Sequence, residues 1–172
     1  MKTLIGPQRF VAGCALALAL ALAGNAVAAS SANFVDEASA AAIAQIETSR
    51  MAISQTSSTG INSFAVEIIK DYTDVNRDLK ELVKKHDLPM SSDDQIASKA
   101  KALMLQVPEG ADFDAAYIAN QVNAQEAAIA LYKQEANNSD SPELKAFAQK
   151  YLPKLESNLT VAKSLARTYS ES

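Results

Sequence analysis

Residues 61–82, INSFAVEIIKDYTDVNRDLKEL, carry the clearest folding pattern in the chain. Apolar or aromatic residues recur at steps of four and three, which places them on one face of a helix. They are Ile61, Ala65, Ile68, Tyr72, Val75, Leu79 and Leu82. The segment therefore predicts an amphipathic helix whose buried face is interrupted once near its middle, by the polar hydroxyl of Tyr72.

Two later segments repeat this pattern and also carry one polar interruption each. The first consists of Ile118, Val122, Gln125, Ile129 and Tyr132, and the second of Leu144, Ala148, Tyr151, Leu155, Asn158, Ala162 and Leu165. Gln125 and Asn158 are the interruptions. Polar residues at the middle of buried helix faces are typical of a metal site or of a hydrogen-bonded layer inside a helix bundle.

Few glycines and prolines divide the chain, as long helices require. We predict long helices at about residues 33–55, 58–86, 112–136 and 141–168. Ser141, Pro142 and Glu143 supply a hydroxyl cap, a proline at the first helical position and an acid in the first turn, which favours a helix start there.

The segment between the second and third long helices is too long for a hairpin turn. Pro89 and Pro108 bracket it, and residues 93–106 carry a weak helical pattern of their own. Such a crossover can return along the second helix, so that the second and third long helices run parallel. We therefore predict an all-α fold: a ferritin-like four-helix bundle of two hairpins joined by a long crossover containing a short helix.

The N-terminus has the features of a secretory signal peptide. Lys2 and Arg9 precede an uncharged apolar run, and the small residues Ala26, Val27 and Ala28 follow it. We predict a signal peptide at residues 1–28 and one domain at 29–172, located in the periplasm or secreted, with outer-membrane association as a further option. A lipoprotein cleavage site at Cys14 is the alternative, although most of the apolar run follows that cysteine.

The charge and composition of the chain indicate which classes of binding partner to expect. The formal net charge is −4, and loss of Lys2 and Arg9 would make it more negative. Without a basic patch carrying interleaved aromatic residues, nucleic acid is not an expected partner. Residues 29–172 contain no apolar run of transmembrane length. We expect an unidentified protein or envelope component as the partner.

Helix midpoints place four polar residues at similar levels in the bundle: Glu47, Tyr72, Gln125 and Asn158. One interpretation is that they hydrogen-bond to one another and fix the helix register, with no metal or other cofactor. The alternative is a divalent cation such as calcium or magnesium, held by oxygens of Glu47, Gln125 and Asn158, with Asp71 or Glu126 adding charge.

The sequence contains no recognisable arrangement of catalytic residues. His86 is the sole histidine, and its place at the end of a predicted helix suits an interaction with the helix dipole. No serine has a histidine at a recognisable catalytic spacing, and no glycine-rich phosphate loop occurs. We therefore expect a protein that is not an enzyme.

Short motifs extend from about residue 33 to residue 165. They are Phe34-Val35 with Glu47, Phe64-Ala65, Asp71 with Asn76, Phe113-Asp114 with Tyr117, Phe147-Ala148 and Leu152-Pro153. Through them the chain resembles the ferritin-like bacterial domain-of-unknown-function family 4142, whose members are often labelled predicted outer membrane proteins. The resemblance implies three histidines, at the places that Tyr72, Gln125 and Asn158 occupy here.

Two main hypotheses follow. The first is an exported, non-catalytic ferritin-like domain of the cell envelope, with a binding or stress-related role and a degenerate metal site. The second is a ferritin-like protein or oxidase that binds iron or a hard cation. A third is a small apolar ligand in a groove beside Tyr151, opened by a helix kink at Pro153.

Overall fold

The computed structural model describes residues 20–104 and 113–170, with side chains for residues 32–104 and 113–169. Within these ranges the chain forms helices and no strands, so the all-α prediction is confirmed. The helices are α1 (Leu20–Gln55), α2 (Thr59–His86), α3 (Asp93–Met104), α4 (Phe113–Asn138) and α5 (Pro142–Ser170). The three long helices α2, α4 and α5 and the short helix α3 occur close to the predicted ranges, and α1 ends at the predicted residue.

The start of the first helix is the one large error. We expected it at about residue 33, but α1 extends back to Leu20, the first residue that the structure describes, and so includes the last nine residues of the predicted leader. Residues 20–32 are mostly alanine and leucine, the strongest helix formers, so nothing in this stretch ends the helix. Cleavage after Ala28 stays a prediction.

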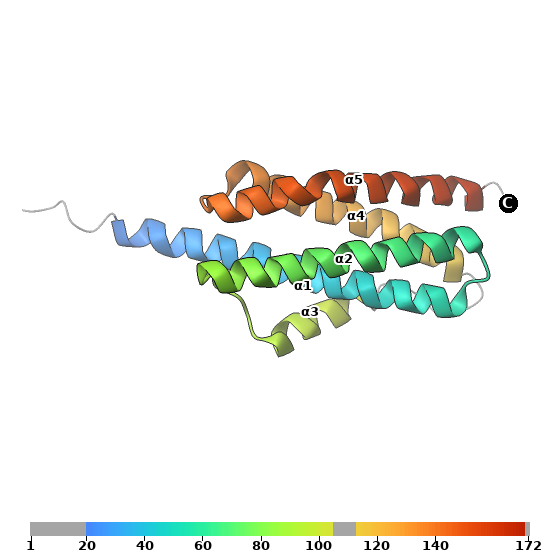
Figure 1. The fold of residues 1–172 in the computed structure, drawn as a ribbon, viewed down its shortest axis with the longest axis horizontal. Coiled ribbons are helices and arrows are strands. Elements are labelled where there is room, and N and C mark those ends of the chain that lie inside the picture. The colour runs from blue at the N-terminus through green and yellow to red at the C-terminus, as the bar shows by residue number, and fades with distance from the viewer. Residues whose placement is uncertain (1–19, 105–112, 171–172) are drawn as a thin grey trace, which may run out of the picture.

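The four long helices form a bundle of two antiparallel hairpins, α1 with α2 and α4 with α5 (Figure 1). The hairpins meet where α1 packs on α4 and where α2 packs on α5. Figure 1 shows α2 and α4 running in the same direction, because the crossover segment containing α3 returns along the bundle. Helix α3 lies against the outside of α1.

Serine side chains cap two of the helix starts. The Oγ of Ser141 accepts a hydrogen bond from the backbone N–H of Leu144 at 3.2 Å, as its sequence context predicts. Ser58 caps α2 in the same way, accepting from the N–H of Ile61 at 3.4 Å. At the other end of α2, Asp87 adopts a left-handed conformation and its N–H bonds the carbonyl of Val83.

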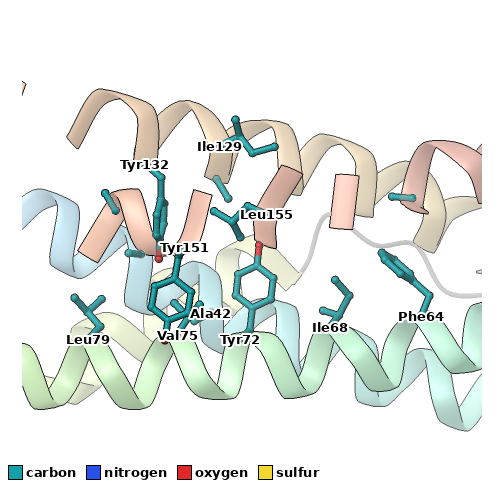
Figure 2. Close-up of a cluster of buried hydrophobic side chains, with 14 of the residues drawn as sticks. Ala42, Phe64, Ile68, Tyr72, Val75, Leu79, Ile129, Tyr132, Tyr151 and Leu155 are labelled. Atoms are coloured by element: carbon teal, nitrogen blue, oxygen red, sulfur yellow. The ribbon is translucent and has the colours of Figure 1, made fainter. Parts of the chain in front are cut away.

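The apolar stripe of α2 forms the centre of the core. Ile61, Ala65, Ile68, Tyr72, Val75 and Leu79 are each at most 2% exposed. Figure 2 shows several of these side chains pointing from α2 toward Leu155 and Ile129 of the second hairpin. An aromatic cluster continues the core, with the ring centroids of Phe34 and Tyr132 5.2 Å apart. Helix α5 continues as one helix through Pro153.

A buried carboxylate attaches the crossover to α1. Asp36 is 6% exposed, and it accepts a hydrogen bond from the backbone N–H of Ser91 at 2.8 Å and another from the Ser91 hydroxyl. The ammonium of Lys99 lies 3.8 Å from the same carboxylate. These contacts hold the beginning of α3 and its middle against α1.

None of the helices described by the structure combines the length and apolar character that a membrane crossing requires.

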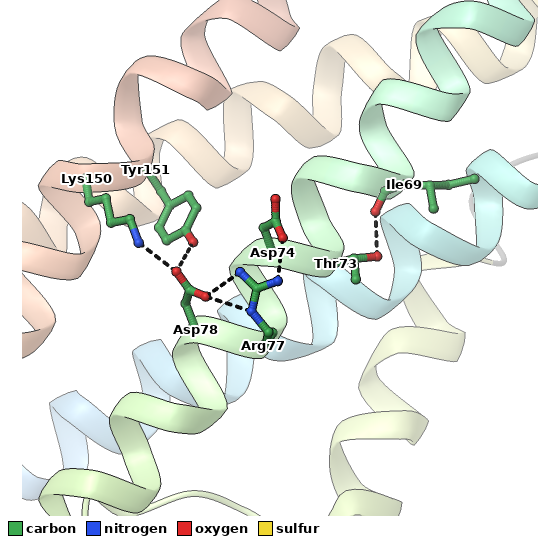
Figure 3. A network of polar contacts seen from close by, with 7 residues as sticks. All are labelled: Ile69, Thr73, Asp74, Arg77, Asp78, Lys150 and Tyr151. Atoms are coloured by element: carbon green, nitrogen blue, oxygen red, sulfur yellow. Dashed lines mark hydrogen bonds and ion pairs between the residues drawn. The ribbon is translucent and has the colours of Figure 1, made fainter.

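A polar network joins α2 to α5 at the protein surface (Figure 3). Asp78 of α2 accepts hydrogen bonds from the ammonium of Lys150 and the hydroxyl of Tyr151, each at 2.6 Å. Arg77 donates to the other oxygen of Asp78 at 2.8 Å. The hydrogen bonds from Lys150 and Tyr151 hold the pKa of Asp78 well below its usual value.

We expect Asp78→Asn to lower the free energy of unfolding by about 1 kcal/mol at pH 7, because it weakens charge-assisted hydrogen bonds between two helices. A depressed carboxyl pKa stabilises the fold above the unfolded pKa, near 4, and this contribution is lost as the pH falls below that value. Urea unfolding at pH 7 and pH 3 should therefore show a smaller acid-induced loss in the variant than in the wild type. Asp74→Asn is the matched control, since Asp74 pairs with Arg77 on its own helix. Equal acid losses in wild type and Asp78→Asn would contradict this role.

Candidate functional site

Tyr72 and Gln125 meet at the centre of the bundle. The Tyr72 hydroxyl donates a hydrogen bond to Oε1 of Gln125 at 2.9 Å, which joins α2 to α4. The two residues are 2% and 0% exposed. Nε2 of Gln125 lies 3.5 Å from Oε1 of Gln121, one helical turn earlier. Two of the residues that interrupt the apolar stripes thus form a direct pair.

Asn158 lies in a second polar cluster, between α2 and α5. Its Nδ2 donates to Oδ2 of Asp71 at 3.1 Å, and both residues are 4% exposed. The ammonium of Lys154 lies 3.1 Å from the other oxygen of Asp71 and 3.8 Å from Glu67. Asp71, Lys154 and Asn158 also line a small cavity of about 300 Å³. The carboxylate nearest the polar centre is therefore already paired with a cation of the protein itself.

The structure places Glu47 and Glu126 outside this centre. Glu47 pairs with Arg50 at 2.6 Å, and its side chain is 40% exposed. Glu126 pairs with Lys163 at 2.7 Å and is half exposed. The expected layer of four residues does not form, because the Glu47 side chain lies on the exposed face of α1 and Asn158 bonds Asp71 instead. The neighbours of Glu47 on α1, Gln45 and Ser49, face the interior.

Sequence reasoning missed several buried polar residues, among them Gln121, Ser49 and Tyr117. Gln121 is 0% exposed and lies four residues before Gln125, so helical spacing could have identified it. Ser49 and Tyr117 share a hydrogen bond of 2.9 Å between α1 and α4. Ser49 is a small residue in a polar part of α1, and Tyr117 is one residue away from the predicted stripe, so neither was apparent from periodicity.

The chemistry of these donors does not suit a transition metal. Burial raises the pKa of Tyr72 well above its usual value, despite the opposing hydrogen bond to Gln125, and burial raises the pKa of Tyr117 in the same direction. Both phenols therefore stay protonated, and the Tyr72 hydroxyl acts as a donor to Gln125. Gln125 and Asn158 offer neutral amide oxygens, which are poor ligands for iron or zinc. Among the described residues, no three histidine, cysteine, aspartate or glutamate side chains gather at one point.

The ammonium of Lys154 also competes with a metal at Asp71. The hydrogen bond to Asp71 is the main cause that raises the pKa of Lys154, so this group stays charged at neutral pH. His86 lies elsewhere, at the end of α2, with Nδ1 3.7 Å from Glu143 at the start of α5. An iron or zinc centre of ferritin type therefore does not fit the residues present.

The fold and this centre define the class: an all-helical bundle with a hydrogen-bonded polar interior. A family model described as "Domain of unknown function (DUF4142)" matches residues 17–165, and the chain belongs to this family. The resemblance inferred from the short motifs is thereby confirmed. No curated protein and no solved structure matches the chain.

We expect Tyr72→Phe to lower the free energy of unfolding by about 1 to 3 kcal/mol, because it leaves Oε1 of Gln125 buried without its donor. The double variant Tyr72→Phe with Gln125→Met should recover much of this loss, since it removes the acceptor as well. Urea unfolding of both single variants and the double variant measures the coupling free energy between the two residues. Additive losses would show that the two side chains do not depend on each other.

Proposed function

We propose that this protein is an exported, ferritin-like domain of the bacterial cell envelope that acts by binding and not by catalysis, and that its metal site is degenerate. The contact that carries this proposal is the ion pair between Lys154 and Asp71, 3.1 Å long. It puts a permanent positive charge of the protein beside the carboxylate that a bound metal would need. The amide of Asn158 completes the partners of that carboxylate.

The arrangement of the helices supports the ferritin-like part of the proposal. Ferritin-like bundles consist of two antiparallel hairpins joined by one long crossover. Here α1 with α2 and α4 with α5 are the hairpins, and the crossover contains α3 (Figure 1). In such folds, metal ligands project inward from the middle of the long helices. Tyr72, Gln125 and Asn158 lie in that part of the bundle.

Export is supported by the sequence of the first 28 residues. Signal peptides have a positively charged start, an apolar run and a cleavage site of small residues. The chain has Lys2 and Arg9 before its apolar run and a small-residue site that ends at Ala28. Cleavage there would leave most of α1 in the mature domain. We propose the periplasm as its location, with an envelope protein or another envelope component as its partner.

The second candidate is a ferritin-like metal-binding protein or oxidase. It is favoured by the family resemblance, which implies histidines at the places of Tyr72, Gln125 and Asn158, and by the buried carboxylate of Asp71. It is disfavoured by the protonated phenol, the two amides and the paired lysine. Elemental analysis of protein purified without chelators distinguishes the two candidates.

We expect the purified wild type to carry only substoichiometric metal and to develop no iron-centre absorption after anaerobic loading with Fe²⁺ and exposure to air. A stoichiometric metal ion or a charge-transfer band would overturn the proposal.

A restoring variant tests whether the site is degenerate. We expect the combined change Tyr72→His, Gln125→His, Asn158→His and Lys154→Ala to bind Co²⁺ and show its visible d–d absorption, because it supplies imidazoles and frees Asp71. The matched control carries the three histidines but retains Lys154, and it should bind Co²⁺ more weakly. Equal Co²⁺ affinities would show that Lys154 does not block the site.

A further inference from the structure

A cavity of about 650 Å³ is lined by residues of α1, α3 and α4 and by Tyr72 of α2. This volume is typical of sites for small organic molecules. Seven of its sixteen described lining residues are alanines: Ala40, Ala41 and Ala44 of α1, Ala102 of α3, and Ala124, Ala127 and Ala128 of α4. Polar side chains also line it, among them Thr48, Asn120 and Asn123. We call this space the alanine groove. It is separate from the small polar cavity beside Lys154.

Short side chains produce the groove. Helices α1 and α4 both present methyl groups to this space, whereas larger side chains such as Phe34, Ile68 and Leu155 occur in the main core cluster. A closely packed interior would fill such a space, since unfilled apolar volume forfeits dispersion contacts. The ring of Tyr72 also lines the groove, while its hydroxyl is bonded to Gln125.

One polar atom in the wall lacks a partner. Gln45 is 5% exposed and lines the groove, and its Oε1 accepts no hydrogen bond within the described part of the chain. A buried acceptor without a donor costs free energy, so such groups normally have a protein, water or ligand partner. The missing partner must be a donor, such as a hydroxyl group.

The charged residues that line the groove argue against an anionic ligand. Glu37 lines the groove and would repel a carboxylate. Lys99 is the one cation among the described lining residues, and its ammonium lies 3.8 Å from the buried carboxylate of Asp36. The acceptor atom of Gln45 would also repel an ionised carboxylate. The groove therefore suits an uncharged head group.

Two leucines belong to the apolar part of the lining. Leu103 of α3 lines the groove and is 39% exposed, which makes it one of the few large apolar side chains at the surface. Together with Leu131 of α4, it extends the apolar wall beyond the alanines. A ligand with an extended hydrocarbon chain could contact both leucines while its hydroxyl reaches Gln45.

We propose that the alanine groove binds an uncharged single-chain amphiphile, with its hydroxyl donating to Oε1 of Gln45 and its hydrocarbon chain lying against the alanines. This inference deepens the proposed function, because it assigns the ligand class and the place of binding. It does not depend on the state of the polar centre around Asp71.

Three ligands of equal chain length test the head group: 1-decanol, methyl decanoate and decanoate at pH 7.5. Isothermal titration calorimetry of the purified full chain should show saturable binding of one 1-decanol. Methyl decanoate, which has no donor, and ionised decanoate should each bind at least about tenfold more weakly, the effect of one buried hydrogen bond. Decanoate binding as tightly as 1-decanol would overturn the assigned ligand class.

Two variants test the place of binding. Gln45→Leu should weaken 1-decanol about tenfold and leave methyl decanoate unchanged, because it removes only the acceptor. Ala124→Phe fills the groove and should abolish binding of both, whereas Ala130→Phe, on the exposed side of α4, should not. Ala124→Leu serves if the larger ring impairs folding, which circular dichroism detects. Unchanged 1-decanol affinity in a folded Ala124 variant would overturn the proposal.

The metal measurements and the ligand titrations test the two proposals independently of each other. A stoichiometric metal would overturn the degenerate centre and leave the alanine groove intact. Absence of saturable 1-decanol binding would overturn the groove assignment, and the ion pair between Lys154 and Asp71 would still explain a metal-free centre.

Discussion

The structure depends on satisfying polar side chains inside an apolar bundle. Each buried polar group needs a partner, and in this bundle the partners come from different helices. Tyr72 with Gln125 joins α2 to α4, Asn158 with Asp71 joins α5 to α2, and the Ser49 to Tyr117 bond joins α1 to α4. A shift of one helix by a single residue would break at least one of these pairs. The polar residues therefore specify a helix register that apolar contacts alone would leave loosely defined.

The fold was largely predictable from the sequence because helical periodicity and capping are local properties. Stripes with steps of three and four located α2, α4 and α5, and the burial of Tyr72, Gln125 and Asn158 followed from their places on those stripes. Glu47 was predicted to belong to the polar centre from its distance along the helix axis to an assumed midpoint. That distance does not determine which face of the helix the side chain occupies. Once α1 was found to begin at Leu20, that midpoint had no meaning.

The partners of Asp71 could not be predicted for a different reason. Lys154 lies on another helix, 83 positions further along the chain, and its long side chain reaches the carboxylate while almost half of it stays in solvent. Such a contact depends on the rotation of α5 about its axis, which no local pattern determines. The alanine groove could not be predicted from the sequence either, because a periodic pattern of apolar residues does not distinguish alanine from leucine. Only the space between packed helices distinguishes a filled interface from an open one.

Tyr72 connects the two regions, since its hydroxyl belongs to the polar centre and its ring forms part of the groove wall. A ligand in the groove would press on a ring whose position is already held by Gln125, so the wall at this point is rigid. Helix α3 also lines the groove, and the hydrogen bond from Ser91 to Asp36 attaches the residues just before α3 to α1. Filling the groove would add dispersion contacts between α1, α3 and α4 that alanine side chains cannot make across the gap. Ligand binding should therefore stabilise the crossover more than the α4 and α5 hairpin, which is already closely packed without it.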